Sequence, residues 1–188
     1  MKTQCILPRF PNIHAGSIQF QLGEDKDGRH LHISKSIGLV LKTFSDDDDF
    51  EAERGVYNIL SGTTTGADIA PKFHGCFVNH WCGVHAVLLG YGGETLPDDY
   101  ELREEEWCVT PSLNVCALSE IDIRSELVMA VDALHALHIH HHDLKWDNIL
   151  RQTSGRLLLI DFHLSDINPD CPEDTCPDRL WLNEGGCI

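Results

Sequence analysis

The stretch from Leu134 to Asp161, LHALHIHHHDLKWDNILRQTSGRLLLID, constrains this chain more than any other. Its pattern predicts the end of an amphipathic helix, then a polar loop, then two short apolar strands joined by a turn. The predicted loop holds four polar residues: His141, Asp143, Lys145 and Asn148. A further carboxylate, Asp161, comes at the end of the second predicted strand.

These residue types fit phosphoryl transfer. That reaction needs a carboxylate near the accepting hydroxyl, a cation near the moving phosphate and oxygen ligands for magnesium. Asp143 would supply the carboxylate and Lys145 the cation, while Asn148 and Asp161 would hold the metal. The alternative is that all four are ordinary loop residues between a helix and a strand, but chance rarely places all four in this order.

The segment HHDLKWDNIL, followed by IDFH, resembles the catalytic loop and the magnesium-binding segment of eukaryotic protein kinases. The interval of 13 residues from Asn148 to Asp161 matches the hairpin of that family. The resemblance implies an α+β, two-lobed fold, with an N-terminal antiparallel β-sheet lobe that carries one helix and a truncated helical C-terminal lobe. It also implies that Asp143 is the catalytic aspartate, that Lys145 contacts phosphate, and that ATP and Mg²⁺ are cofactors.

We expect a single domain over residues 1–188, with an N-lobe at about 17–91, a hinge at 92–96 and a C-lobe with its tail at 97–188. Alternating and apolar patterns predict strands in the N-lobe. These predicted strands cover residues 17–23, 29–36, 37–44, 72–79 and 83–91, the last two as an antiparallel pair.

The predicted third strand contains LVLK and ends near Lys42. A lysine on such a strand is usually a surface residue that extends its ammonium to water, but here it resembles the lysine that anchors ATP in kinases. Aspartates 46–49 are expected to cap a following helix at 50–62. Within that helix we prefer Glu53 over Glu51 as the partner of Lys42.

The hinge prediction places adenine against Leu89 and the backbone of Gly90, Tyr91 and Gly92. The glycine-rich loop that covers the phosphates in kinases is not evident, because the corresponding turn is mainly acidic and holds Gly23 and Gly28. Negative charge near a triphosphate raises the Coulomb energy. Farther along, we expect residues 63–71 to form a loop, 97–107 an acidic surface helix, and about 119–138 a long helix opened by a capping pair, Ser119 with Asp122.

Five clustered histidines allow a different hypothesis, because imidazoles at suitable spacing bind zinc. These are His135, His138, His140, His141 and His142. No second ligand group has a recognisable spacing, although Cys171 and Cys176 lie in the proline-rich tail. The sequence therefore favours a role for His141 in bracing the loop through backbone hydrogen bonds.

The resemblance ends after Asp161, where 27 residues remain. An activation segment and substrate-platform helices do not fit there, His163 replaces the glycine of DFG, and His142 replaces the arginine of HRD. The apolar side of the long helix would then be uncovered. We expect that the tail folds back over it, that another chain or an oligomer covers it, or that the sequence is a shortened form of a longer protein.

The formal net charge of −16 argues against nucleic acid or an anionic membrane as a partner. An N-terminus broken by prolines and the lack of a long apolar run favour a cytoplasmic location, with the eight cysteines reduced. The leading hypothesis is a Ser/Thr protein-kinase-like phosphotransferase that acts on a protein. Two alternatives stay open: a pseudokinase scaffold without turnover, and a small-molecule kinase of the aminoglycoside-phosphotransferase type.

Overall fold

The computed structural model describes residues 21–22, 30–79, 83–96, 120–169, 172 and 175–184. Several predictions fall outside these residues: the start of the first strand, the turn around Gly28, the acidic helix at 97–107 and the capping residue Ser119. The role considered for Cys171 also lies outside them.

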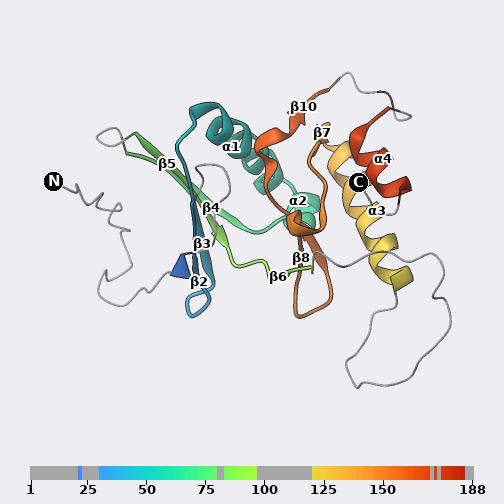
Figure 1. The fold of residues 1–188 in the computed structure, drawn as a ribbon, viewed down its shortest axis with the longest axis horizontal. Coiled ribbons are helices and arrows are strands. Elements are labelled where there is room, and N and C mark those ends of the chain that lie inside the picture. The colour runs from blue at the N-terminus through green and yellow to red at the C-terminus, as the bar shows by residue number, and fades with distance from the viewer. Residues whose placement is uncertain are drawn as a thin grey trace.

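A five-stranded antiparallel sheet forms one end of the described chain, in the order β1-β2-β3-β5-β4 (Figure 1). Its strands are β1 (Gln21–Leu22), β2 (His30–Ser34), β3 (Leu39–Phe44), β4 (Phe73–Asn79) and β5 (Val84–Gly90). The predicted antiparallel pair is confirmed as β4 and β5, and Lys42 lies in β3 opposite Val87 of β5.

Helix α1 (Asp47–Ser61) packs across the sheet and begins three residues earlier than predicted, inside the aspartate run. Asp46 is the N-cap, and its carboxylate accepts the backbone N–H groups of Asp48 and Asp49 at 2.9 and 3.0 Å. These bonds satisfy amides that have no partner within the helix. Gly62 follows the last helical residue as the C-cap.

The loop predicted at 63–71 is wrong in its middle, where helix α2 (Thr64–Ile69) forms. Thr63 caps this helix by accepting the N–H of Gly66 at 2.9 Å. A Cβ at Gly66 would lie 2.1 Å from the carbonyl oxygen of Leu60, so close packing against α1 requires glycine there. The packing of α2 on α1 outweighs its low intrinsic helix propensity.

Short strands connect the sheet to the second half of the described chain. The two apolar strands predicted after the loop are confirmed as β8 (Ile149–Arg151) and β9 (Leu157–Leu159), and β6 (Glu94–Thr95) pairs with β8. A second, two-stranded pair joins β7 (Ile139–His140) to β10 (Asp166–Ile167). Two 3₁₀ turns, η1 (Trp146–Asn148) and η2 (Phe162–Leu164), lie between these strands.

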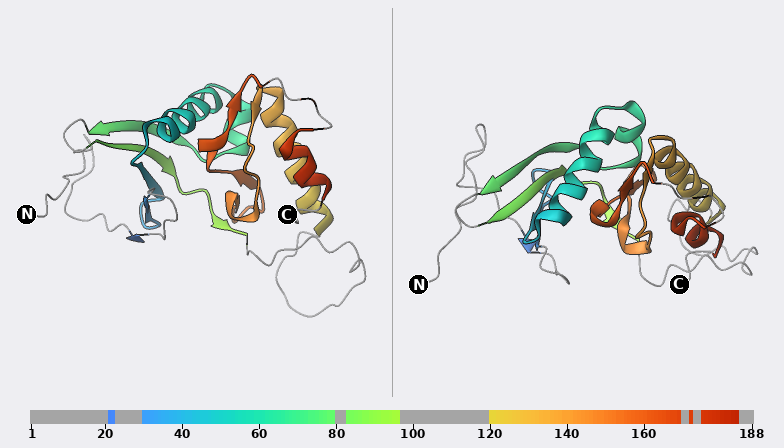
Figure 2. Two further views of the ribbon diagram at one scale, coloured as in Figure 1. Left: turned by 45° about the horizontal axis from the view of Figure 1, so that its top comes forward. Right: turned by 90° about the horizontal axis from the view of Figure 1, so that it is seen from above.

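At the other end, the predicted long helix is α3 (Glu120–Ala136), and α4 (Pro177–Asn183) lies beside it (Figure 2). The tail therefore folds back onto the long helix, as one of the three expectations stated. Trp181 of α4 packs edge-on against Trp146 at 5.1 Å between ring centroids, and Arg179 pairs with Asp132 at 2.5 Å. Met129 of α3 is still 62% exposed.

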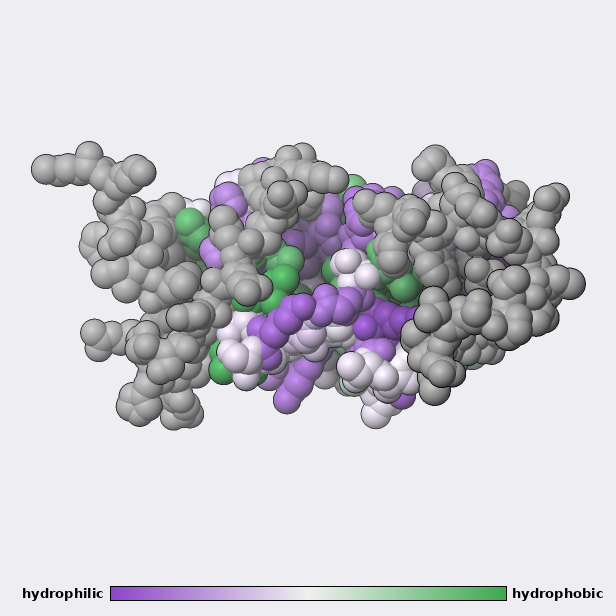
Figure 3. Space-filling view, turned by 60° about the horizontal axis from the view of Figure 1, so that its bottom comes forward, coloured by the Kyte–Doolittle hydropathy of each residue, from purple (hydrophilic) through white to green (hydrophobic). Residues whose placement is uncertain are grey.

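One continuous core joins these parts, since Tyr57, Val87, Leu127 and Phe162 belong to the same buried cluster. The fold is thus mixed α+β with an antiparallel sheet, while the division into lobes at 17–91, 92–96 and 97–188 stays a prediction. No helix in the described ranges has the length and hydropathy that a membrane span requires. Turned so that the bottom of Figure 1 comes forward, the described surface is mainly hydrophilic, with smaller hydrophobic patches (Figure 3).

Candidate functional site

Lys42 joins two carboxylates from distant parts of the chain. Its ammonium lies 2.8 Å from Oε2 of Glu53, on α1, and 2.6 Å from Oδ1 of Asp161, which follows β9. Burial alone lowers the pKa of Lys42, but the two carboxylates outweigh burial and raise it. Lys42 is therefore a charged group at neutral pH.

Glu53 is fully buried, and its second oxygen Oε1 has no hydrogen-bond partner among the described residues. Burial raises the pKa of Glu53, Lys42 opposes that shift, and the charge on Asp161 adds to it. The competing residue Glu51 lies on another face of α1, where it pairs with exposed Arg54. The structure thus brings Glu53, and not Glu51, to Lys42.

Asp161 sits in the left-handed region, at φ 69°, immediately before η2. Besides Lys42, the ring nitrogen Nδ1 of His163 contacts Oδ1 of Asp161 at 2.7 Å. Although burial by itself raises the pKa of Asp161, the hydrogen bond from His163 and the charge of Lys42 lower it well below its ordinary value. Positive φ is uncommon in non-glycine residues, and such residues cluster at functional sites, although His138, His142 and Asn168 also have it.

The three loop residues predicted to act together do lie together. The side-chain amide of Asn148 donates to the backbone oxygen of Asp143 at 2.8 Å and to its Oδ2 at 3.0 Å. Lys145 donates to the same Oδ2 at 2.7 Å. The backbone of Asn148 also accepts the N–H of Ile160 at 3.0 Å, which places the loop next to Asp161.

His141 braces this loop, as predicted. Its ring is fully buried, and Nε2 lies 2.9 Å from the carbonyl oxygen of Ile160. A carbonyl can only accept, so Nε2 carries the proton. Burial lowers the pKa of His141, which keeps the ring neutral. Its ring also packs against Phe162 at 5.1 Å, beside Asp161.

Sequence reasoning missed Asp178, which holds the same loop from the opposite side. Its oxygens accept the backbone N–H groups of His141 and His142 at 2.7 and 2.8 Å. Although burial by itself raises the pKa of Asp178, hydrogen bonds from His135 and these amides lower it. The one available signal was Pro177, because proline favours the first position of a helix.

The residues predicted to hold adenine lie at and just beyond the end of β5, an inner strand of the sheet. Leu89 is buried and pairs with Val40. The N–H groups of Gly90 and Tyr91 already donate within the protein, to Lys72 at 2.7 Å and to Gly38 at 2.8 Å. Of the three backbone positions expected to meet adenine, Gly92 is therefore the one whose N–H could donate to a ligand without breaking one of these hydrogen bonds.

Gly93 is a glycine for steric reasons, and Gly92 lies in a crowded position. A Cβ at Gly92 would lie 2.7 Å from the end of the Leu150 side chain, whereas one at Gly93 would lie 2.2 Å from the backbone carbonyl oxygen of Arg151. Gly93 also has φ 124°, which side chains disfavour. This turn lets the chain pass closely over β8 on its way from β5 to β6.

Comparison with known proteins gives short local matches. No family model matches the chain. Serine/threonine-protein kinase OXI1 of Arabidopsis thaliana is 48% identical over 50 residues, or 26% of this chain and 12% of that protein. Probable serine/threonine protein kinase IRE4 of the same plant is 51% identical over 43 residues, 23% of this chain and 4% of the relative.

Human serine/threonine-protein kinase MRCK beta is 46% identical over 37 residues, which is 20% of this chain and 2% of that kinase. The matches therefore span a small part of each relative's length. Together they indicate that a short part of this chain is related to serine/threonine protein kinases.

Proposed function

We propose that the chain is a protein-kinase-like phosphotransferase that moves the γ-phosphate of ATP to a serine or threonine hydroxyl of a protein. The observation that carries this proposal is the double contact of Lys42, which links Glu53 and Asp161 at 2.8 and 2.6 Å. This arrangement holds a cation beside a carboxylate at the junction of sheet, helix and loop. The proposal includes a two-lobed fold with a hinge at 92–96.

The donor chemistry near Asp161 suits magnesium, which prefers oxygen ligands. Asp161 offers carboxylate oxygens, and Asn148 offers its amide oxygen, because its amide nitrogen makes both bonds to Asp143. Asp161 and Asn148 would therefore hold Mg²⁺, which when bound neutralises charge on the phosphates. Lys42 would supply a second positive charge, directed at the α- and β-phosphates.

Asp143 is positioned to accept a proton from the attacking hydroxyl. Its side chain is 23% exposed, and Lys145 and Asn148 both donate to Oδ2, so we assign Oδ1 as the accepting oxygen. The hydroxyl oxygen forms a bond to the γ-phosphorus while the bond from that phosphorus to the bridging oxygen of ADP breaks. Lys145 lies close enough to Asp143 to orient it and to contact the transferred phosphate.

A transfer assay with γ-labelled ATP, magnesium and a serine/threonine peptide library tests this function. We expect labelled peptide or labelled protein from the wild type and a rate about 10²–10⁴-fold lower from Asp143→Asn. Asp161→Ala is expected to lose both ATP binding and transfer. Asp68→Asn is the matched control, because this exposed carboxylate pairs with Arg156 outside the site.

Equal transfer by the wild type and Asp143→Asn would contradict the assignment of the base. Transfer to an aminoglycoside but to no peptide would instead indicate a small-molecule kinase. If ATP neither binds nor raises the melting temperature of the wild type, the chain is a scaffold.

His163 favours the second candidate, a pseudokinase that binds partners without turnover. Its ring nitrogen Nδ1 lies 2.7 Å from Oδ1 of Asp161, and Asp161 is the carboxylate that would otherwise coordinate magnesium. We expect His163→Gly to tighten magnesium-dependent ATP binding about tenfold, because a charge-assisted hydrogen bond no longer competes with the metal. Calorimetric titration measures this. Unchanged affinity would show that His163 does not compete with the ion.

A further inference from the structure

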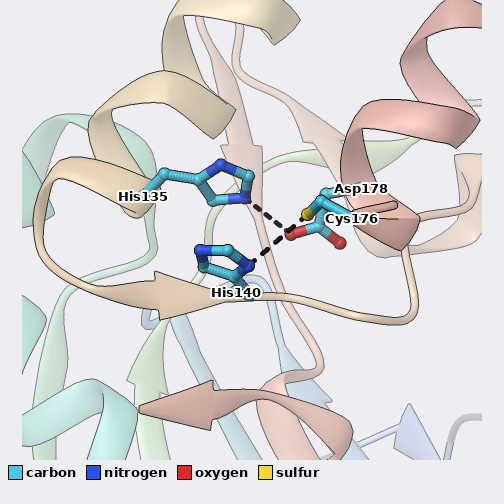
Figure 4. A group of neighbouring side chains, drawn as sticks. All are labelled: His135, His140, Cys176 and Asp178. Atoms are coloured by element: carbon cyan, nitrogen blue, oxygen red, sulfur yellow. Dashed lines mark hydrogen bonds and ion pairs between the residues drawn. The ribbon is translucent and has the colours of Figure 1, made fainter. Parts of the chain in front are cut away.

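Four metal-binding side chains from three elements converge beside the polar loop. They are His135 at the end of α3, His140 on β7, and Cys176 and Asp178 at the start of α4 (Figure 4). One ligand atom from each residue lies within 4.8 Å of all the others. We propose that these four residues form a structural site for a zinc-like divalent transition metal.

The chemistry and spacing of the four groups fit tetrahedral zinc. Zinc binds imidazole nitrogen, thiolate sulfur and carboxylate oxygen, and its bond lengths of about 2.0–2.3 Å place neighbouring ligand atoms roughly 3.3–3.8 Å apart. Nε2 of His135 lies 2.9 Å from Oδ2 of Asp178, and Sγ of Cys176 lies 3.4 Å from Nδ1 of His140. Shifts of about an ångström would therefore seat an ion between them.

The cluster is largely shielded from water, as a structural site requires. Cys176 is 1% exposed and Asp178 is fully buried, while His140 is half-buried and the side chain of His135 is 12% exposed. Four protein ligands close the coordination shell and leave no open position for substrate, which distinguishes a structural ion from a catalytic one. The zinc hypothesis from the histidine run lacked a second ligand group, and the fold supplies it from α4.

Proton balance is simple. Without metal, Nε2–H of His135 donates to Asp178, and Cys176 is a free thiol. When metal binds, the thiol proton leaves to solvent and the His135 proton moves to Nδ1, so Nε2 and the thiolate become ligands. Asp178 loses the hydrogen bond from His135, binds the ion in its place, and keeps its hydrogen bonds from the backbone amides of His141 and His142.

This position gives the ion a structural consequence. Asp178 accepts the backbone N–H groups of His141 and His142, so an ion fixed to Asp178 would fasten α4 to α3, β7 and the polar loop together. The inference is independent of phosphotransfer, because the ion would join the same elements in a pseudokinase scaffold without turnover.

The test uses the full chain, stripped of metal by a chelator and then dialysed against zinc alone. We expect one zinc per chain by elemental analysis and a melting temperature about 5–10 °C higher at a zinc concentration near 100 times Kd. Cys176→Ser and His140→Gln are expected to lose the bound zinc and the shift. Cys76→Ser and His138→Gln are matched controls outside the cluster and should retain both.

Binding of cobalt alone gives a spectroscopic signal in the wild type itself, and this signal does not depend on whether a variant folds. The wild type and Cys76→Ser should show a thiolate-to-cobalt charge-transfer band, and Cys176→Ser should lose it. The proposal is overturned if the wild type shows no such band and binds no zinc. It is equally overturned if Cys176→Ser and His140→Gln keep zinc at wild-type stoichiometry, because the metal would then be held by other residues.

Discussion

Asp161 and Asp178 are both removed largely from water, yet their partners differ in kind. Asp161 faces the side chains of Lys42 and His163, and its own side chain is 21% exposed. Asp178 faces two backbone N–H groups in addition to His135, and it has no exposure. Hydrogen bonds and nearby charge lower the pKa of each carboxyl despite burial.

The difference separates a carboxylate that is contacted by side chains from one that is also fixed by two backbone amides. Lys42 and His163 contact Asp161 through their side chains, and the exposed fifth of Asp161 offers access to a ligand. The amides beside Asp178 are fixed in the loop, so losing the carboxylate would leave them buried without an acceptor. We therefore propose ligand binding for Asp161, whereas Asp178 holds the loop through its amides.

The largest expected effect on stability comes from Asp178→Ala. Two buried amides lose a charged acceptor, which should lower the free energy of unfolding by about 3–5 kcal/mol. Urea denaturation measures the loss. Asp132→Ala is the control, because its pair with Arg179 is half exposed and should contribute only about 0–1 kcal/mol. If Asp178→Ala and Asp132→Ala both lower the free energy of unfolding by an equally small amount, the two backbone amides do not make Asp178 a special structural group.

A somewhat smaller loss is expected from Lys42→Met. Two carboxylates then share a buried site without their ammonium, at a cost of about 3 kcal/mol in unfolding free energy. The double variant Lys42→Met with Glu53→Leu should recover part of that loss, since it also removes the buried charge. Denaturation of the single and double variants at pH 7 measures the coupling. A double variant less stable than the single one would show that Glu53 is stabilising without Lys42.

Whether a helix or strand could be predicted depends on the length of its hydrophobic pattern in the sequence. The long helix was predictable because Leu127, Val131 and Leu134 recur at helical spacing, and all three are fully buried. The residues of the polar loop came from family resemblance, and their roles stay predictions. Strands β7 and β10, of two residues each, are too short to show a period.

The other omissions have tertiary causes. Helix α2 depends on the close approach of Gly66 to α1, which no local pattern in a threonine- and glycine-rich segment encodes. Asp178 acts through backbone amides of residues 36 and 37 positions earlier, and backbone groups carry no sequence signal. The sequence offered His135, His140 and Cys176 as possible zinc ligands but not Asp178, because tertiary packing is what brings the four side chains together.

The smallest expected effect is a pH dependence from His141. Burial lowers its pKa in the folded chain below the unfolded value of about 6.5. The folded state therefore binds fewer protons than the unfolded state. The contribution of the neutral His141 ring to the free energy of unfolding is complete above about pH 6.5 and is lost as pH falls below that value, at up to about 1.4 kcal/mol per pH unit. Urea denaturation at pH 7.0 and 5.5 should show this fall.

His141→Leu should be less stable at pH 7.0 but should fall less between the two pH values. His138→Gln, at an exposed position, should keep the wild-type fall. If His141→Leu keeps the full pH dependence, the buried imidazole is not its source.

The central claim is that Lys42, Glu53 and Asp161 form a nucleotide site, and calorimetric titration of the wild type and Asp161→Asn with magnesium-ATP tests it most directly. The account predicts saturable binding by the wild type that requires magnesium and is at least about tenfold weaker in Asp161→Asn, since one charged ligand is lost. Wild-type protein that binds no ATP, or equal affinity in the two proteins, would contradict it.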